Sequence, residues 1–130
     1  MKKILLTGGC GFIGSYLLKT GIKKKYKILN VDKLSYASKK QNIKNKNYSF
    51  KKIDLCDKKK LAVAFKKFNP DIIINCAAES HVDRSIINPL IFFNSNLIGT
   101  VNLLELSIKS KKKNSLHSNF NRWSIWIIKI

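Results

Sequence analysis

The residues best suited to chemistry in this chain form a glycine-rich heptad near the N-terminus. It reads Gly8-Gly9-Cys10-Gly11-Phe12-Ile13-Gly14, so glycines recur at positions 8, 11 and 14. The first can allow a tight turn, the second a close approach of backbone to an anion, and the third close packing of a helix on a strand. A helix beginning here would add free N–H groups and its positive dipole end. The loop therefore predicts a pyrophosphate site, although such a heptad taken alone also fits a structural turn.

Two aspartates stand where carboxylates would complete a dinucleotide site. Asp32 ends a predicted strand 18 residues after Gly14, where it can accept hydrogen bonds from ribose hydroxyls and favour NAD over NADP. The alternatives are an ordinary strand-end aspartate and a salt bridge from the neighbouring Lys33 to a 2′-phosphate. Asp54 ends the next strand at the same edge, where it can bind the adenine amino group or simply start a helix.

The three cysteines predict neither a disulfide framework nor a zinc site. Cys10, Cys56 and Cys76 are odd in number and widely spaced, without a Cys-x-x-Cys pair. This usage fits a reducing compartment. We therefore expect a cytoplasmic protein without a bound metal.

The elements that must position these residues follow from the apolar pattern. Short apolar runs predict four strands, at residues 2–7, 26–31, 48–53 and 72–76. Helical spacing predicts three helices, at residues 12–20, 58–68 (with Asp57 as a cap) and about 89–109. Strands that alternate with helices and are apolar throughout indicate an α/β fold with a covered parallel sheet. Right-handed crossovers then give a doubly wound, Rossmann-type sheet of order 3-2-1-4.

The strong positive charge has two interpretations. The chain holds 26 Lys+Arg against 7 Asp+Glu, a net charge of +19, and 24 of the basic residues are lysine. Arginine, which is preferred for phosphate and base contacts, is nearly absent, so A/T-rich coding with a solvated lysine surface explains the excess. The alternative is a basic, non-catalytic module that binds nucleic acid. The apolar content excludes a disordered chain, and no apolar run is long enough to span a bilayer, so we expect neither nucleic acid nor membrane as a partner.

A longer block after the fourth predicted strand resembles a known family. Residues 75–86 read NCAAESHVDRSI, similar to the dTDP-glucose 4,6-dehydratases among the extended short-chain dehydrogenases/reductases. Further matches are TGGCGFIG at 7–14, VDKLSYA at 31–37, DLCD at 54–57 and FNSNLIGT at 93–100. Together they cover residues 1 to about 112. Related nucleotide-sugar epimerases share the glycine loop but usually lack the whole Ala-Ala-Glu-Ser-His block, so an epimerase fragment is the alternative.

The resemblance implies a role for each matching position. The NAD-binding residues would be Gly8, Gly11, Phe12, Ile13, Gly14, Asp32, Lys33, Leu34, Ser35, Asp54, Leu55, Cys76, Ala77, Ala78, Glu79, Ser80 and Ser95. Positions 12–13 would bind the pyrophosphate, 32–35 the adenosine ribose, 54–55 the adenine and 76–80 the nicotinamide half. Ser95 stands where the family usually has threonine. Ser80 and His81 would approach the nucleotide sugar, although His81 also fits a loop histidine that caps the next helix.

The resemblance also implies a reaction that this chain is not equipped to complete. The family converts dTDP-glucose to dTDP-4-keto-6-deoxyglucose by internal hydride transfer through NAD and elimination of water, and its full-length members are expected to be homodimers. The chemistry needs a tyrosine base and an Asp–Glu pair, found in a Ser-Thr-Asp-Glu-Val-Tyr-Gly segment and a later Tyr-x-x-x-Lys. The segment is absent, and all four tyrosines precede the fourth predicted strand. We therefore expect no catalytic residue and no activity from the chain alone.

The tail breaks the pattern just where a fifth strand is due. After the lysine run it reads NSLHSNFNRWSIWIIKI, without clear alternation and with both tryptophans. With one choice of synonymous codons, residues 116–129 read one base later give FIQISTDGVYGSL, which resembles the missing strand and catalytic turn. We therefore expect residues 1–112 to form the NAD-binding part and 113–130 to be an out-of-frame tail. The sheet would then end at the fourth strand, with Ile72–Ile74 beside an unpaired edge.

Overall fold

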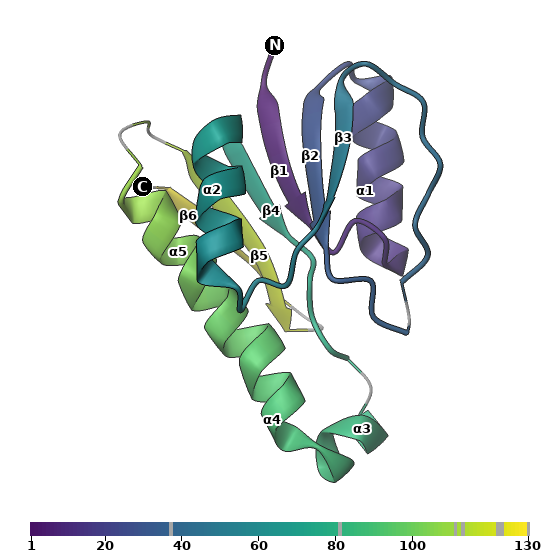
Figure 1. Cartoon of the computed structure of the whole chain (residues 1–130), viewed down its shortest axis with the longest axis vertical. Coiled ribbons are helices and arrows are strands. Elements are labelled where there is room, and N and C mark those ends of the chain that lie inside the picture. The colour runs from purple at the N-terminus through teal and green to yellow at the C-terminus, as the bar shows by residue number, and fades with distance from the viewer. Residues whose placement is uncertain (37, 81, 111, 113, 122–123, 130) are drawn as a thin grey trace.

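One sheet runs through the molecule, and helices cover both of its faces (Figure 1). The computed structural model describes residues 1–36, 38–80, 82–110, 112, 114–121 and 124–129. The strands are β1 (Lys3–Thr7), β2 (Lys27–Asp32), β3 (Tyr48–Lys52), β4 (Ile72–Asn75), β5 (Ser115–Asn121) and β6 (Ser124–Lys129). The helices are α1 (Phe12–Lys23), α2 (Lys58–Phe68), α3 (Val82–Ile87), α4 (Pro89–Phe92), the π-helix η1 (Phe93–Ile98) and α5 (Gly99–Ile108).

The strand order confirms the predicted Rossmann-type α/β fold and extends it by two strands. The order is β3-β2-β1-β4-β5-β6. Strands β1 to β5 run parallel, and β6 returns antiparallel beside β5. The chain winds from β1 outward to β3 and then crosses back to β4, so the winding direction reverses between β1 and β4. In such sheets a ligand binds beyond the carboxyl ends of the strands at this point.

The expectation that the sheet ends at β4 is wrong. β5 pairs in parallel with β4, with Ile72 opposite Ser115 and Ile74 opposite His117. The strand run Ile72–Ile74 therefore has a neighbour on both sides, since β1 lies along its other edge. Residues that follow the lysine run thus contribute to the sheet.

The burial of β5 explains why its hydrophobic pattern was uninformative. Asn114, Leu116 and Ser118 are buried, while the residues between them are half-buried. This is the period of two that a strand requires. Because two of the three buried side chains are polar, the alternation is one of burial and not of hydrophobicity.

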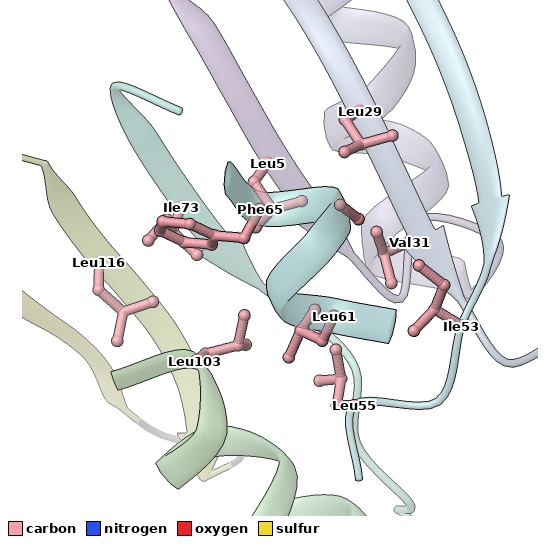
Figure 2. Close-up of a cluster of buried hydrophobic side chains, with 11 residues drawn as sticks. Leu5, Leu29, Val31, Ile53, Leu55, Leu61, Phe65, Ile73, Leu103 and Leu116 are labelled. Atoms are coloured by element: carbon pink, nitrogen blue, oxygen red, sulfur yellow. The ribbon is translucent and has the colours of Figure 1, made fainter. Parts of the chain in front are cut away.

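Two apolar clusters hold the helices against opposite faces of the sheet. The alternation of β1 places Leu5 in one cluster and Ile4 and Leu6 in the other. Figure 2 shows the larger cluster, which packs α2 and α5 on the sheet and contains Leu5, Leu29, Val31, Ile53, Leu55, Leu61, Ala64, Phe65, Ile73, Leu103 and Leu116. The smaller cluster lies under α1 and contains Ile4, Leu6, Leu18 and Ile28. This burial holds the helices on the sheet whose strand ends carry the polar residues discussed below.

Helix α2 shows its sequence signals at both ends. The Asp57 carboxylate accepts a hydrogen bond from the Lys60 backbone N–H at 3.1 Å, as predicted for an N-cap. At the other end Asn69 has a left-handed backbone, with φ of 49°, and its N–H bonds back to the Phe65 carbonyl oxygen. Pro70 follows, where a helix cannot continue.

The long predicted helix forms, but its hydrogen bonding changes along its length. α4, η1 and α5 together form one helix over Pro89–Ile108, with the π-helical stretch inside it. Within the described part of the chain it is the one helix long and apolar enough to cross a membrane, judged by length and composition alone. Leu103 is fully buried against the sheet, and Asn102 Nδ2 donates to the Leu55 carbonyl oxygen at 2.8 Å. These contacts dock the α5 part of the helix on the domain, whereas α4 and η1 bury no residue.

The packing of β5 predicts that its single buried leucine contributes strongly to stability. Leu116→Ala removes a side chain that is 1% exposed, and we expect it to lower the free energy of unfolding by about 3 kcal/mol. Leu90→Ala, at a 69% exposed position, is the matched control and should change stability by less than about 0.5 kcal/mol. Urea unfolding followed by circular dichroism measures both. Equal effects of the two substitutions would show that β5 is not part of the folded core.

Candidate functional site

The glycine loop lies at the point where the winding of the sheet reverses. It connects Thr7 at the end of β1 with Phe12 at the start of α1. Gly8 has a φ of +66°, and a Cβ there would lie 2.6 Å from the backbone of Ala77 and Cys76, just after β4. A Cβ on Gly14 would overlap the carbonyl oxygen of Gly8. The fold itself therefore requires glycine at these two positions.

Gly11 differs, because nothing near it in the chain requires glycine. A Cβ there would lie 3.4 Å from the Gly8 carbonyl oxygen, an ordinary van der Waals contact. Its φ of −81° is open to any residue. Gly11 is the N-cap of α1 and offers no side chain to the helix, whose first turn also carries no acidic residue. The N–H groups of that first turn are therefore available to an external anion.

Two polar side chains at the end of β2 hold the loop. Asn30 Oδ1 accepts a hydrogen bond from Gly9 N at 3.1 Å, and Asp32 Oδ2 accepts one from Cys10 N at 3.0 Å. The other oxygen of Asp32 accepts from Leu34 N at 2.8 Å. Both side chains are buried. The spacing after Gly14 predicted Asp32 as a residue of the cofactor site. Asn30 was not predicted, and the one signal for it in the sequence is a polar residue inside an apolar strand.

A cavity of about 390 Å³ opens between the loop and the ends of β2, β3 and β4. Its lining residues are Gly8, Gly11, Phe12, Ile13, Val31, Asp32, Lys33, Ser35, Tyr36, Ser38, Ile53, Asp54, Leu55, Ala77, Ala78, Glu79, Ser80 and Ser95. All the predicted cofactor positions are among them except Gly14, Leu34 and Cys76. Gly14 is buried behind the loop, and Cys76 packs beside the smaller apolar cluster.

The structure adds four lining residues that sequence reasoning missed. Val31 lies near the end of β2, Ile53 directly follows β3, and Tyr36 and Ser38 belong to a polar loop without a pattern. The guanidinium of Arg84 lies 3.5 Å from the centre of the Tyr36 ring, which links α3 to this loop. His81, predicted near the nucleotide sugar, lies outside the described residues. Its neighbour Ser80 does line the cavity.

An ion pair joins two walls of the cavity. Lys33 Nζ lies 3.0 Å from Glu79 Oε1 and donates to Ser95 Oγ at 2.7 Å. The side-chain amide of Asn96 makes two hydrogen bonds to the backbone of Glu79. Its Oδ1 accepts from the Glu79 N–H at 2.8 Å, and its Nδ2 donates to the Glu79 carbonyl oxygen at 3.0 Å. The segments after β2 and β4 are thereby both tied to the π-helix η1.

A chain of buried hydroxyl and amide groups lies beneath the cavity. Thr7 Oγ1 donates to Asn75 Oδ1 at 2.5 Å, so the ends of β1 and β4 are joined by their side chains. Asn75 Nδ2 lies 3.1 Å from Thr100 Oγ1 and 3.0 Å from Ser118 Oγ. These bonds extend the connection to α5 and β5. They satisfy polar groups that would be costly to bury alone.

Two tyrosines of this chain have the Tyr-x-x-x-Lys spacing, and the geometry of Tyr48 does not suit a catalytic pair. Tyr36 and Tyr48 each have a lysine four residues later, at positions 40 and 52. Residues 48 and 52 are the two ends of strand β3, roughly 13 Å apart. Burial raises the pKa of Tyr48, opposite to what a general base needs, and Lys40 Nζ lies 5.2 Å from the Phe50 ring centre.

The thiols and carboxylates around the site form no reactive or metal-binding centre. Burial raises the pKa of Cys10 beneath the glycine loop, and it raises that of Cys76 to about 11. Thiols of this kind are poor nucleophiles at neutral pH. All three cysteines are free. In the described ranges, no group of three or more His, Cys, Asp or Glu side chains could hold a metal ion.

The sequence and the fold are both similar to those of nucleotide-sugar enzymes. The chain is 44% identical over 110 residues to a dTDP-glucose 4,6-dehydratase of Neisseria meningitidis serogroup B, covering 81% of this chain and 31% of that protein. It is 41% identical over 124 residues to dTDP-glucose 4,6-dehydratase 1 of Escherichia coli K12, covering 87% and 34%. This chain thus spans about a third of the length of these relatives.

Solved structures show the same likeness. A dTDP-glucose 4,6-dehydratase from Bacillus anthracis in complex with NAD matches with a TM-score of 0.71 and 36% identity, covering 84% of this chain and 34% of that one. A UDP-glucose 4-epimerase from Thermotoga maritima with UDP-glucose matches with a TM-score of 0.78 and 35% identity, covering 85% and 35%. The family model described as GDP-mannose 4,6 dehydratase matches residues 5–120. With glycine loop, strand order and sequence in agreement, this chain belongs to the GDP-mannose 4,6-dehydratase family.

Proposed function

We propose that this chain is the NAD-binding part of a dTDP-glucose 4,6-dehydratase. The observation that carries the proposal is the cavity, where an uncapped helix N-terminus, a glycine not required by the fold and a buried carboxylate meet at one edge of the sheet. The relatives named above support the substrate class, and the Bacillus anthracis structure supports the cofactor.

The lining residues fit the parts of the dinucleotide in turn. The first-turn amides of α1 would bind the pyrophosphate, and Gly11 leaves room for its close approach. The remaining lone pairs of Asp32 would accept hydrogen bonds from the ribose hydroxyls. Ile53 and Leu55 offer apolar walls for the adenine, with Asp54 exposed beside them. Residues 77–80 would follow the nicotinamide half. When bound, NAD supplies a hydride acceptor.

The exposed apolar face of the long helix supports a second copy as partner. Ile87, Leu90, Leu97 and Val101 are all exposed large hydrophobic side chains on α3, α4, η1 and α5. Apolar surface of this kind favours association. We propose that full-length members form a homodimer through this apolar face. We also propose that the protein resides in a reducing cytosol, which suits the three free thiols.

We further propose that the 130 residues alone do not dehydrate a nucleotide sugar. They contain no Ser-Thr-Asp-Glu-Val-Tyr-Gly segment, and Tyr48 and Lys52 lie at opposite ends of strand β3, roughly 13 Å apart. Residues 113–130 would arise from a one-base slip near Asn114. Pairing of β5 with β4 is compatible with this origin, because main-chain bonds do not depend on side-chain identity.

The cavity predicts a selective effect of one small substitution. Gly11→Ala should weaken NAD binding at least ~10-fold, because its methyl group would occupy the space for the pyrophosphate, while stability falls by no more than about 1 kcal/mol. Gly21→Ala is the matched control: its Cβ would meet Ile28 at 2.7 Å, so it should reduce stability and spare NAD affinity in the folded protein. Calorimetric titration with NAD and thermal melts measure both. NAD binding of unchanged strength in Gly11→Ala would contradict the assignment.

The proposed origin of the tail predicts the coding sequence. Read one base later from Leu116, the DNA should continue into a dehydratase-like reading that includes a Tyr-x-x-x-Lys segment. Sequencing the locus and translating it in all three frames is the measurement. The proposal fails if no frame downstream continues the family's sequence.

A further inference from the structure

We propose that Glu79 sets the preference of this site for NAD over NADP by holding Lys33 away from the adenosine ribose. The inference rests on the proposed function, since it concerns which dinucleotide the cavity takes. It assigns Glu79 a positioning role that acts through Lys33, in addition to the carboxylate of Asp32.

The contacts of Lys33 show that its ammonium group is already engaged. It lies 3.0 Å from Glu79 Oε1 and 2.7 Å from Ser95 Oγ. The side chain of Glu79 is only 9% exposed and that of Lys33 is 32% exposed. A pair this sheltered is less screened by solvent than a surface ion pair. Pairing Lys33 with a ligand would therefore mean breaking two interactions in a partly dry site.

The backbone of the residue that engages Lys33 is itself held in place. Asn96 clamps the Glu79 backbone through its N–H at 2.8 Å and its carbonyl oxygen at 3.0 Å. Ser95 and Asn96 are consecutive residues of the π-helix η1, and they reach Lys33 and the backbone of Glu79 respectively. Such π-helical turns often occur where consecutive residues serve a site. Glu79 therefore has little freedom to release Lys33.

The charges around the cavity explain why the pairing of Lys33 with Glu79 disfavours NADP. Its 2′-phosphate adds close to two negative charges and needs a cation. Among the described residues that line the cavity Lys33 is the one cation, against the carboxylates of Asp32, Asp54 and Glu79. The guanidinium of Arg84 lies over the Tyr36 ring. With Lys33 withdrawn, a 2′-phosphate inside the cavity would meet carboxylates and find its nearest further lysines, Lys52 and Lys60, only in the adjoining hollow beside Asp54, whereas ribose hydroxyls need only an acceptor.

The test compares the two dinucleotides on the full chain. Dissociation constants for NAD and NADP are measured by calorimetry for the wild type and for Glu79→Gln, which keeps the shape but removes the charge. We expect the affinity for NADP relative to NAD to rise roughly tenfold in the variant. Glu105→Gln is the matched control, because Glu105 also pairs with lysines, Lys58 and Lys109, but away from the cavity. The affinity of Glu105→Gln for NADP relative to NAD should equal that of the wild type.

A second substitution separates this role from a purely structural one. Adding Lys33→Gln to Glu79→Gln should return the ratio toward the wild-type value, because the gain acts through the released lysine. If Glu79 served only to stabilise the structure, Glu79→Gln would instead weaken the binding of both dinucleotides by the same factor, and the ratio of the two affinities would not change. Should Glu79→Gln fail to fold, Ser95→Ala removes the other partner of Lys33 and should raise the ratio by about threefold.

The outcomes distinguish this inference from the function on which it rests. NAD binding by the wild type together with an unchanged ratio in Glu79→Gln, or in Ser95→Ala where the first variant does not fold, overturns the role of Glu79 alone. A wild type that binds neither dinucleotide overturns the proposed function and the inference with it. A raised ratio that Lys33→Gln does not reverse also contradicts the mechanism.

Discussion

The close approach of the Gly8 backbone to the residues just after β4 is the constraint on which the site depends. No side chain fits there, and the left-handed backbone of Gly8 turns the chain from β1 straight into α1. The turn places the N-terminus of α1 beyond the carboxyl ends of the neighbouring strands β1 and β4, where the winding reverses. Asn30 and Asp32 then hold the next two amides of the loop. The cavity exists because the loop is pressed against β4 on one side and bonded to β2 on the other.

Polar groups, more than apolar ones, connect this site to the rest of the domain. The apolar clusters fix the helices on each face but are indifferent to small shifts of a strand end. The Thr7–Asn75 bond and its extensions to Thr100 and Ser118 join β1, β4, α5 and β5 directly beneath the cavity. Above them, η1 binds the segments after β2 and β4 through Ser95 and Asn96. The walls of the cavity are thus positioned by directional bonds, which define geometry more sharply than burial does.

Sequence reasoning predicted what depends on local pattern. The first four strands, the helices α1 and α2, the long helix, the order 3-2-1-4 and the Asp57 cap all follow from periodicity and spacing, and most of the predicted cofactor positions do line the cavity. The short helix α3 was not predicted. It missed β5, because the buried positions 114 and 118 are polar and hide the strand period. It also missed Asn30 and the pairing of Lys33 with Glu79, residues 46 positions apart that only the crossover brings together. Such contacts carry no short-range signal.

The central claim is that this cavity binds NAD. Amide chemical shifts of the isotope-labelled chain, recorded by NMR as NAD is added, test it most directly. The claim predicts that saturable shifts are concentrated at Gly11, Phe12 and Ile13 in the first turn of α1 and at Lys33 and Glu79 across the cavity. Saturable shifts confined to residues outside the cavity, or no shifts at millimolar NAD, would contradict it.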